Sequence, residues 1–212
     1  MLEFALDTFI TFFVVIDPIG MAPVFIGLTS GASAEYRRKM AIRGTLIGAG
    51  ILIGFAAVGQ MLLDAMGISL PAMRIAGGIL LFLVAFDMLF ARQSGLRSTT
   101  ESETEEAHFR PDISVFPLAI PLMAGPGGIT TVLLLVSGAQ GDWAQIGLGM
   151  GIMLLVLAMA LVALLLAGAL TRLLGEIGSN VISRVLGVIL SALAVQFVIT
   201  GMAALGFGNA GG

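Results

Sequence analysis

Long apolar stretches alternate with short polar segments along the whole chain. Each of the six stretches has about the 20 residues that are needed to span the hydrocarbon core of a bilayer. They cover residues 4–28, 40–63, 71–91, 114–138, 145–170 and 183–205. The pattern predicts an all-α transmembrane fold, a six-helix bundle that occupies residues 1–212 as a single membrane domain.

The composition supports this class and excludes several others. Hydrophobic residues make up 58% of the chain and charged residues 11%, whereas a soluble domain has about 25% charged residues. Cysteine is absent, which excludes disulfides, thiolate metal sites and a cysteine nucleophile. The net charge of −3 and the scattered basic residues argue against a nucleic-acid partner. The lipid bilayer is the expected partner, and no metal site or cofactor is predicted.

One connection, residues 92–113, is long, polar and acidic. It divides the chain into two three-helix halves, residues 4–91 and 114–206. All lysines and arginines except Arg74 fall on one side of a six-helix topology. Because the side rich in these residues faces the cytoplasm, we expect both termini outside. Loops 1–2, 3–4 and 5–6, including the 92–113 linker, are then cytoplasmic.

The two halves resemble each other. A shift of about 108–110 positions aligns a proline, a glycine and an arginine of each half. The aligned pairs are Pro18 with Pro126, Gly20 with Gly128, and Arg74 with Arg184. Since three helices per half is an odd number, the halves insert with opposite topology and are predicted to be inverted repeats, an arrangement that suits alternating access in a transporter.

Two short segments rich in proline and glycine interrupt apolar stretches. Asp17-Pro18-Ile19-Gly20 lies in the first, and Ala124-Gly125-Pro126-Gly127-Gly128 lies in the fourth. Helices 1 and 4 are therefore predicted to be broken, and lipid cannot satisfy the backbone groups that a break releases. Breaks at corresponding positions of two halves point to a transporter's binding site.

Asp17 is the sharpest candidate at the first break. It lies about 20 Å into an apolar run, where an ionisable side chain is costly and indicates function. Pro18 and Gly20 both favour an unwound turn beside it. The carboxylate is then placed to hold a substrate ammonium or a coupling cation. The alternative, which is compatible with the first, is that it caps the second half-helix at backbone N–H groups.

The second break offers the complementary chemistry. A helix that restarts at Gly125-Pro126-Gly127-Gly128 presents backbone amides and a positive dipole end, which suit a carboxylate. Thr130 and Thr131 add hydroxyl groups to the same turn. A zwitterionic amino acid could bridge the two breaks. The alternative is that the small residues permit close helix packing.

Four further polar residues are candidates to line the path. Arg74 and Arg184 begin helices 3 and 6 at equivalent repeat positions; each could pair with a carboxylate or snorkel to the interface. Asp87 and Gln196 occupy near-matching places in the repeat. They could face the path or make interhelical hydrogen bonds. A site for a divalent cation would need several carboxylates at the breaks, and the second break has none.

The two interrupted segments, residues 13–25 and 116–131, together resemble the MarC family of bacterial inner-membrane proteins. The basic cluster after helix 1, the six-helix count and the acidic central loop also fit, so the resemblance covers essentially the whole chain. It implies an inner-membrane protein with inverted repeats, distantly similar to amino acid exporters. For some members it implies transport of small neutral amino acids such as glycine and alanine.

The leading interpretation is an inner-membrane secondary transporter or exporter that binds a small zwitterionic solute between the two broken helices. The chain lacks the common zinc-protease, serine-hydrolase and phosphate-loop motifs, so an enzyme is not predicted. Two alternatives stay open: a non-transporting membrane protein with a packing or partner-stabilising role, and a transporter of a cation or another small solute. The sequence leaves open the direction, homo-oligomerisation, and coupling to protons or sodium.

Overall fold

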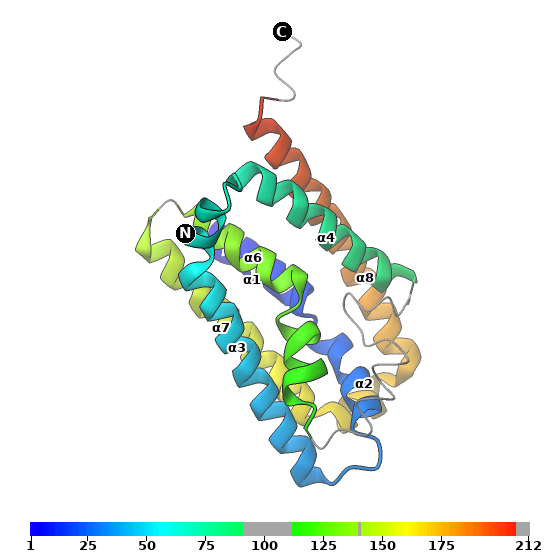
Figure 1. Ribbon diagram of the computed structural model, residues 1–212. Coiled ribbons are helices and arrows are strands. Elements are labelled where there is room, and N and C mark those ends of the chain that lie inside the picture. Colours follow the sequence, from blue (N-terminus) through cyan, green and yellow to red (C-terminus); the bar gives the residue numbers. More distant parts are fainter. Residues whose placement is uncertain (91–111, 140, 207–212) are drawn as a thin grey trace.

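The computed structural model describes residues 1–90, 112–139 and 141–206, and these residues form helices and short connections without a β-strand. The first half contains α1 (Leu2–Ile16), α2 (Pro18–Leu28), α3 (Ala34–Ala65) and α4 (Leu70–Phe90). The second half contains the irregular helical segment η1 (Ser114–Met123), whose backbone is non-helical at Phe116 and Ile120, followed by α6 (Pro126–Gly138), α7 (Trp143–Leu165) and α8 (Ala167–Ala204). Figure 1 shows them as one elongated bundle. Most of the predicted 92–113 linker lies outside the described residues.

The helices have the lengths and composition of membrane spans. Within the described residues, five helical segments are long and apolar enough to cross a bilayer, with α1 and α2 counted together as Leu2–Leu28, or up to six if the bent pair η1 and α6 forms one span. Large apolar side chains remain exposed along their outer faces, among them Phe82, Val162 and Val188. Exposed apolar surface of this extent is typical of lipid contact rather than of a soluble monomer. The protein is therefore an all-helical, multi-pass integral membrane protein.

One predicted boundary is wrong. The fifth stretch was expected to continue to residue 170, but α7 ends at Leu165 and α8 begins at Ala167. Leu166 leaves the helical conformation (φ −97°, ψ 8°), and Gly175 (φ 64°, ψ 175°) then kinks α8. The sequence remains apolar across Leu166, so hydropathy does not mark the turn. The span in α8 covers Asn180–Ala204.

Both proline- and glycine-rich segments coincide with interruptions of helix geometry. Asp17, with φ 46° and ψ 71°, is the single left-handed residue between α1 and α2. Ala124 and Gly125 separate η1 from α6, and the two helices are bent by 58°. Pro18 and Pro126 each occupy the first turn of the helix that follows, where a missing N–H breaks no intrahelical bond.

The helices of the first half pack mainly against helices of the second half. Helix α1 packs on α7, and η1 packs on α3; α2 packs on α7 and α8, and α6 packs on α3 and α4. Helices α4 and α8 form the closest pair, visible along one side of Figure 1. This pair is antiparallel, because Gly201 lies against Pro71 and Arg74, whereas Gly187 lies against Ala85 and Met88.

Two apolar clusters fill the interior. The larger includes Phe12, Phe25, Leu118 and Met153 and joins α1, α2, α3, η1 and α7. The smaller joins the end of α1 to α4 and α8 through Val14, Val15, Leu81 and Leu190. Consequently the end of α1, just before Asp17, lies where the two clusters meet.

Candidate functional site: two helix interruptions and a cavity

The Asp17 carboxylate is buried at the first break, with 2% of the residue exposed. Its Oδ1 accepts a hydrogen bond from the backbone N–H of Gly20 (2.9 Å), as an N-cap residue does. Its Oδ2 accepts one from the Ser183 hydroxyl of α8 (3.3 Å). The capping interpretation of Asp17 is thus observed directly, and its role toward a solute stays a prediction.

The close surroundings of Gly20 explain why a glycine stands there. A Cβ on Gly20 would collide with the Asp17 carboxylate and would lie 2.8 Å from the Ser183 oxygen. Pro18, which is also buried, starts α2 beside it. The first break is therefore a compact hydrogen-bonded turn that ties α2 to α8.

The second break is packed almost as tightly. A Cβ on Gly127 would lie 3.0 Å from Leu81 and 3.1 Å from Val15, and one on Gly128 would lie 3.2 Å from the Met123 carbonyl. The space left beside Gly125, Pro126, Gly127 and Gly128 is about 10 Å³. That is about the room one water molecule needs, so this conformation holds no amino acid at the break itself.

The two threonines after the second break have different surroundings. The Thr130 side chain is 2% exposed and packs against Gly77 of α4. The Thr131 hydroxyl donates to the Gly127 carbonyl (2.8 Å), and the residue also lines a larger cavity. Thr131 therefore links the second break to that cavity.

The cavity has a volume of about 310 Å³ and lies between α1, α4, α6 and α8. Three predicted candidates line it together: Arg74 from α4, Thr131 from α6 and Gln196 from α8. Asp7 of α1, which was not among the predicted candidates, is also a lining residue. Asp7 lies ten positions before Asp17 in the chain, about 15 Å at helical rise.

The remaining candidates lie elsewhere. Arg184 is exposed on α8, and Asp87 is buried in α4 with 9% of the residue exposed. Neither lines the cavity of about 310 Å³ or the small space at the second break. Among the residues that the structure describes, no three His, Cys, Asp or Glu side chains are grouped to hold a metal ion.

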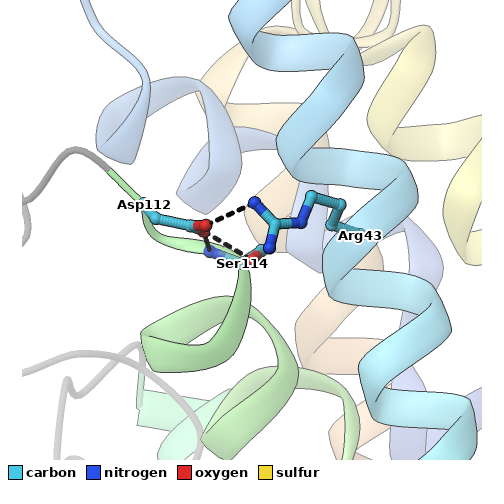
Figure 2. A network of polar contacts seen from close by, with 3 residues as sticks. All are labelled: Arg43, Asp112 and Ser114. Atoms are coloured by element: carbon cyan, nitrogen blue, oxygen red, sulfur yellow. Dashed lines mark hydrogen bonds and ion pairs between the residues drawn. The ribbon is translucent and has the colours of Figure 1, made fainter.

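A polar network joins the start of η1 to α3 at the other end of the bundle. Figure 2 shows Asp112 between Arg43 and Ser114. Its Oδ2 lies 2.6 Å from Arg43 Nη1, and its Oδ1 accepts from the Ser114 hydroxyl (2.5 Å) and the Ser114 backbone N–H (2.9 Å). The hydrogen bonds from Ser114, with a smaller contribution from Arg43, lower the pKa of Asp112.

Acid is expected to remove the stabilisation that this network provides. A carboxylate whose pKa is lowered on folding stabilises the fold fully above its ordinary pKa, 3.8 for Asp112, and loses this contribution as the pH falls through the lower folded-state value. We expect Asp112→Asn to lower the free energy of unfolding by less than about 1 kcal/mol near neutral pH, because the side chains of Asp112 and Arg43 are both more than one-third exposed. The difference in melting temperature from wild type, measured in detergent, should shrink as the pH falls below 3.8; a difference that does not change as the pH is lowered contradicts this assignment.

The interrupted spans and the apolar outer surface define a polytopic helical membrane protein, and comparison with known proteins identifies its family. Residues 2–205 match the model of the MarC family integral membrane proteins. The chain is 39% identical over 202 residues to a UPF0056 membrane protein of Archaeoglobus fulgidus, covering 95% of this chain and 93% of the relative. The chain belongs to the MarC family, which confirms the resemblance seen in the sequence.

Two further relatives match over a similar share of the chain. The UPF0056 membrane protein YvbG of Bacillus subtilis is 34% identical over 204 residues, covering 95% of each chain. The UPF0056 membrane protein YhcE of Escherichia coli is 36% identical over 195 residues, covering 92% of this chain and 89% of the relative. No solved structure matches the chain.

Proposed function

We propose that the protein is an inner-membrane secondary transporter or exporter for small neutral amino acids. The solute passes between the two interrupted helices, with Asp17 on one side and the Gly125–Thr131 turn on the other. Both termini lie outside, and the end of the bundle that carries Arg43 and Asp112 faces the cytoplasm. The observation that carries the proposal is the contact of Val15, two residues before Asp17, with Gly127, beside a cavity that Thr131 lines.

The order of helix packing supports inverted repeats. Exchanging the two halves turns the contact of α1 with α7 into that of η1 with α3, and the contacts of α2 with α7 and α8 into those of α6 with α3 and α4. The same exchange leaves the α4–α8 and α3–α7 contacts unchanged. A two-fold relation of this kind allows each half to form the gate that the other half opens.

The contact between the breaks supports a shared passage. Val15 lies two residues before Asp17, and its side chain is the nearest α1 group to Gly127 in the second break. A small displacement at this contact changes both breaks together. The tight packing seen here then corresponds to a conformation in which the passage is closed at its centre.

Uptake of labelled glycine, alanine and serine into proteoliposomes tests this function. We expect saturable uptake by the wild type and a loss of about tenfold or more for Asp17→Asn, because a buried charge at the passage is removed. The variant must elute and melt like wild type for the comparison to count. Normal uptake by Asp17→Asn rules out the proposed role of the carboxylate.

One observation favours the non-transporting alternative. Both oxygens of Asp17 are engaged by Gly20 and Ser183, and the glycines of the second break pack on neighbouring side chains. These contacts are also what a purely structural role requires. The absence of uptake for all three amino acids, with verified insertion, supports that role or another solute.

A further inference from the structure

We propose that the cavity between α1, α4, α6 and α8 is a recognition site for a small zwitterion, with Asp7 facing its ammonium group and Arg74 its carboxylate. This inference rests on the proposed function for the class of solute. It concerns a place about 15 Å along α1 from Asp17, and it names a residue, Asp7, that the breaks do not include.

Two residues of opposite charge, Asp7 and Arg74, line the cavity. Asp7 comes from α1 and Arg74 from α4, and they line the same space of about 310 Å³. Within the described part of the chain, neither side chain has an ion pair or a hydrogen bond. Asp7 is exposed and Arg74 is half-buried, so a ligand that enters this space can reach both charges. One ligand with both charges compensates both residues.

The position of the Arg74 side chain supports this assignment. A Cβ on Gly138 would lie 3.7 Å from Arg74 Nη2, so the guanidinium reaches from α4 to the end of α6. Its stem packs beside Gly201 of α8. The side chain thus extends from α4 past α8 and α6 and lines the cavity, where the fork of donors of a guanidinium suits recognition of a carboxylate.

Neutral groups complete the polar part of the wall. The hydroxyls of Thr11 and Thr131 already donate to backbone carbonyls of their own helices, at 2.7 Å and 2.8 Å. Since each hydroxyl has one hydrogen, their lone pairs remain as acceptors. Acceptors near Asp7 fit an ammonium group, and they extend the site toward the second break at Thr131.

The size and apolar lining restrict the ligand. A volume of about 310 Å³ lies at the lower end of the range for small-molecule sites, about 300–1,000 Å³. Phe4, Phe12 and Phe197 close the apolar part of the wall. The combination fits a neutral α-amino acid with a small or apolar side chain. A single carboxylate does not make a site for a divalent cation.

Calorimetric titration of the purified full-length protein with L-alanine tests the site. We expect Asp7→Asn and Arg74→Gln each to weaken binding about tenfold or more, since each removes one charge-assisted contact. Glu3→Gln in α1 and Arg172→Gln in α8 are the matched controls, because they remove the same charges outside the cavity. The controls should stay within about twofold of wild type.

Ligand analogues test the same site without a variant. L-alaninamide lacks the carboxylate, and L-lactate has a hydroxyl in place of the ammonium group. We expect the wild type to bind each about tenfold more weakly than alanine. Arg74→Gln should lose the preference over the amide, and Asp7→Asn should lose the preference over lactate.

The outcomes separate this site from the proposed function. If alanine is transported and both variants bind it with unchanged affinity, the proposed site is wrong and the proposed transport function stands. If alanine binding depends on the two charges but no transport is seen, the proposed site stands and the proposed transport function is wrong. Neither binding nor flux for alanine, glycine or serine overturns both.

Discussion

The Gly78→Ala variant is expected to melt about 4–8 °C below wild type, because one added methyl group forces α4 and α8 apart. An ideal Cβ at this position would lie 2.6 Å from the Ala194 carbonyl oxygen and 3.0 Å from the Val198 backbone nitrogen. Both are backbone atoms of α8, so no side-chain rotation relieves the contact. Overpacking of this kind costs about 1–3 kcal/mol.

A glycine without close neighbours provides the control. Nothing lies within 4 Å of a Cβ built on Gly54 of α3, and alanine is the better helix former by about 1 kcal/mol. The melting temperature of Gly54→Ala should therefore equal or exceed that of wild type in the same detergent and at the same scan rate. A Gly78→Ala variant as stable as Gly54→Ala would show that α4 and α8 do not approach as closely as described.

Replacing Asp17 is expected to have an effect that depends on the new residue. Asp17→Ala should lower the free energy of unfolding by about 2 kcal/mol or more. The substitution removes the N-cap of α2 and leaves the Gly20 N–H without its acceptor, while residue 17 keeps its left-handed backbone. Alanine has no side-chain group to compensate the cost of that conformation. Thermal melting of the purified protein measures the loss.

The Asp17→Asn variant separates geometry from charge. Asparagine tolerates the left-handed conformation and keeps an oxygen that accepts from Gly20. We expect its melting temperature to stay within about 3 °C of wild type. Equal destabilisation by the two substitutions would contradict the cap, and would indicate that the carboxylate charge itself holds the break together.

Local chemistry was readable from the sequence. Proline removes a backbone donor and glycine permits unusual backbone angles, so Pro18 and Pro126 indicated where helix geometry changes. The bilayer length requirement likewise located the apolar segments. The turn at Leu166 carried no such signal, since its residues are as apolar as the helices on either side.

Contacts between distant segments were not readable. Ser183 meets Asp17 across 166 positions of the chain, and the packing of α1 and α2 on α8 brings them together. Arg74, Thr131 and Gln196 were candidates singly, but their common cavity depends on four helices. Asp7, Thr8 and Thr11 did offer a signal that was missed, because residues at spacings of three and four share one helix face.

The most direct test of the account is counterflow of labelled L-alanine in proteoliposomes. Vesicles loaded with unlabelled alanine and diluted into a trace of labelled alanine should accumulate label transiently, because a carrier exchanges solute across the membrane. Empty vesicles and vesicles loaded with an unrelated sugar should not. Accumulation with alanine inside is the predicted result. Equal labelling with and without internal alanine, from protein shown to be inserted and folded, would contradict the central claim that this MarC-family protein is an amino acid carrier.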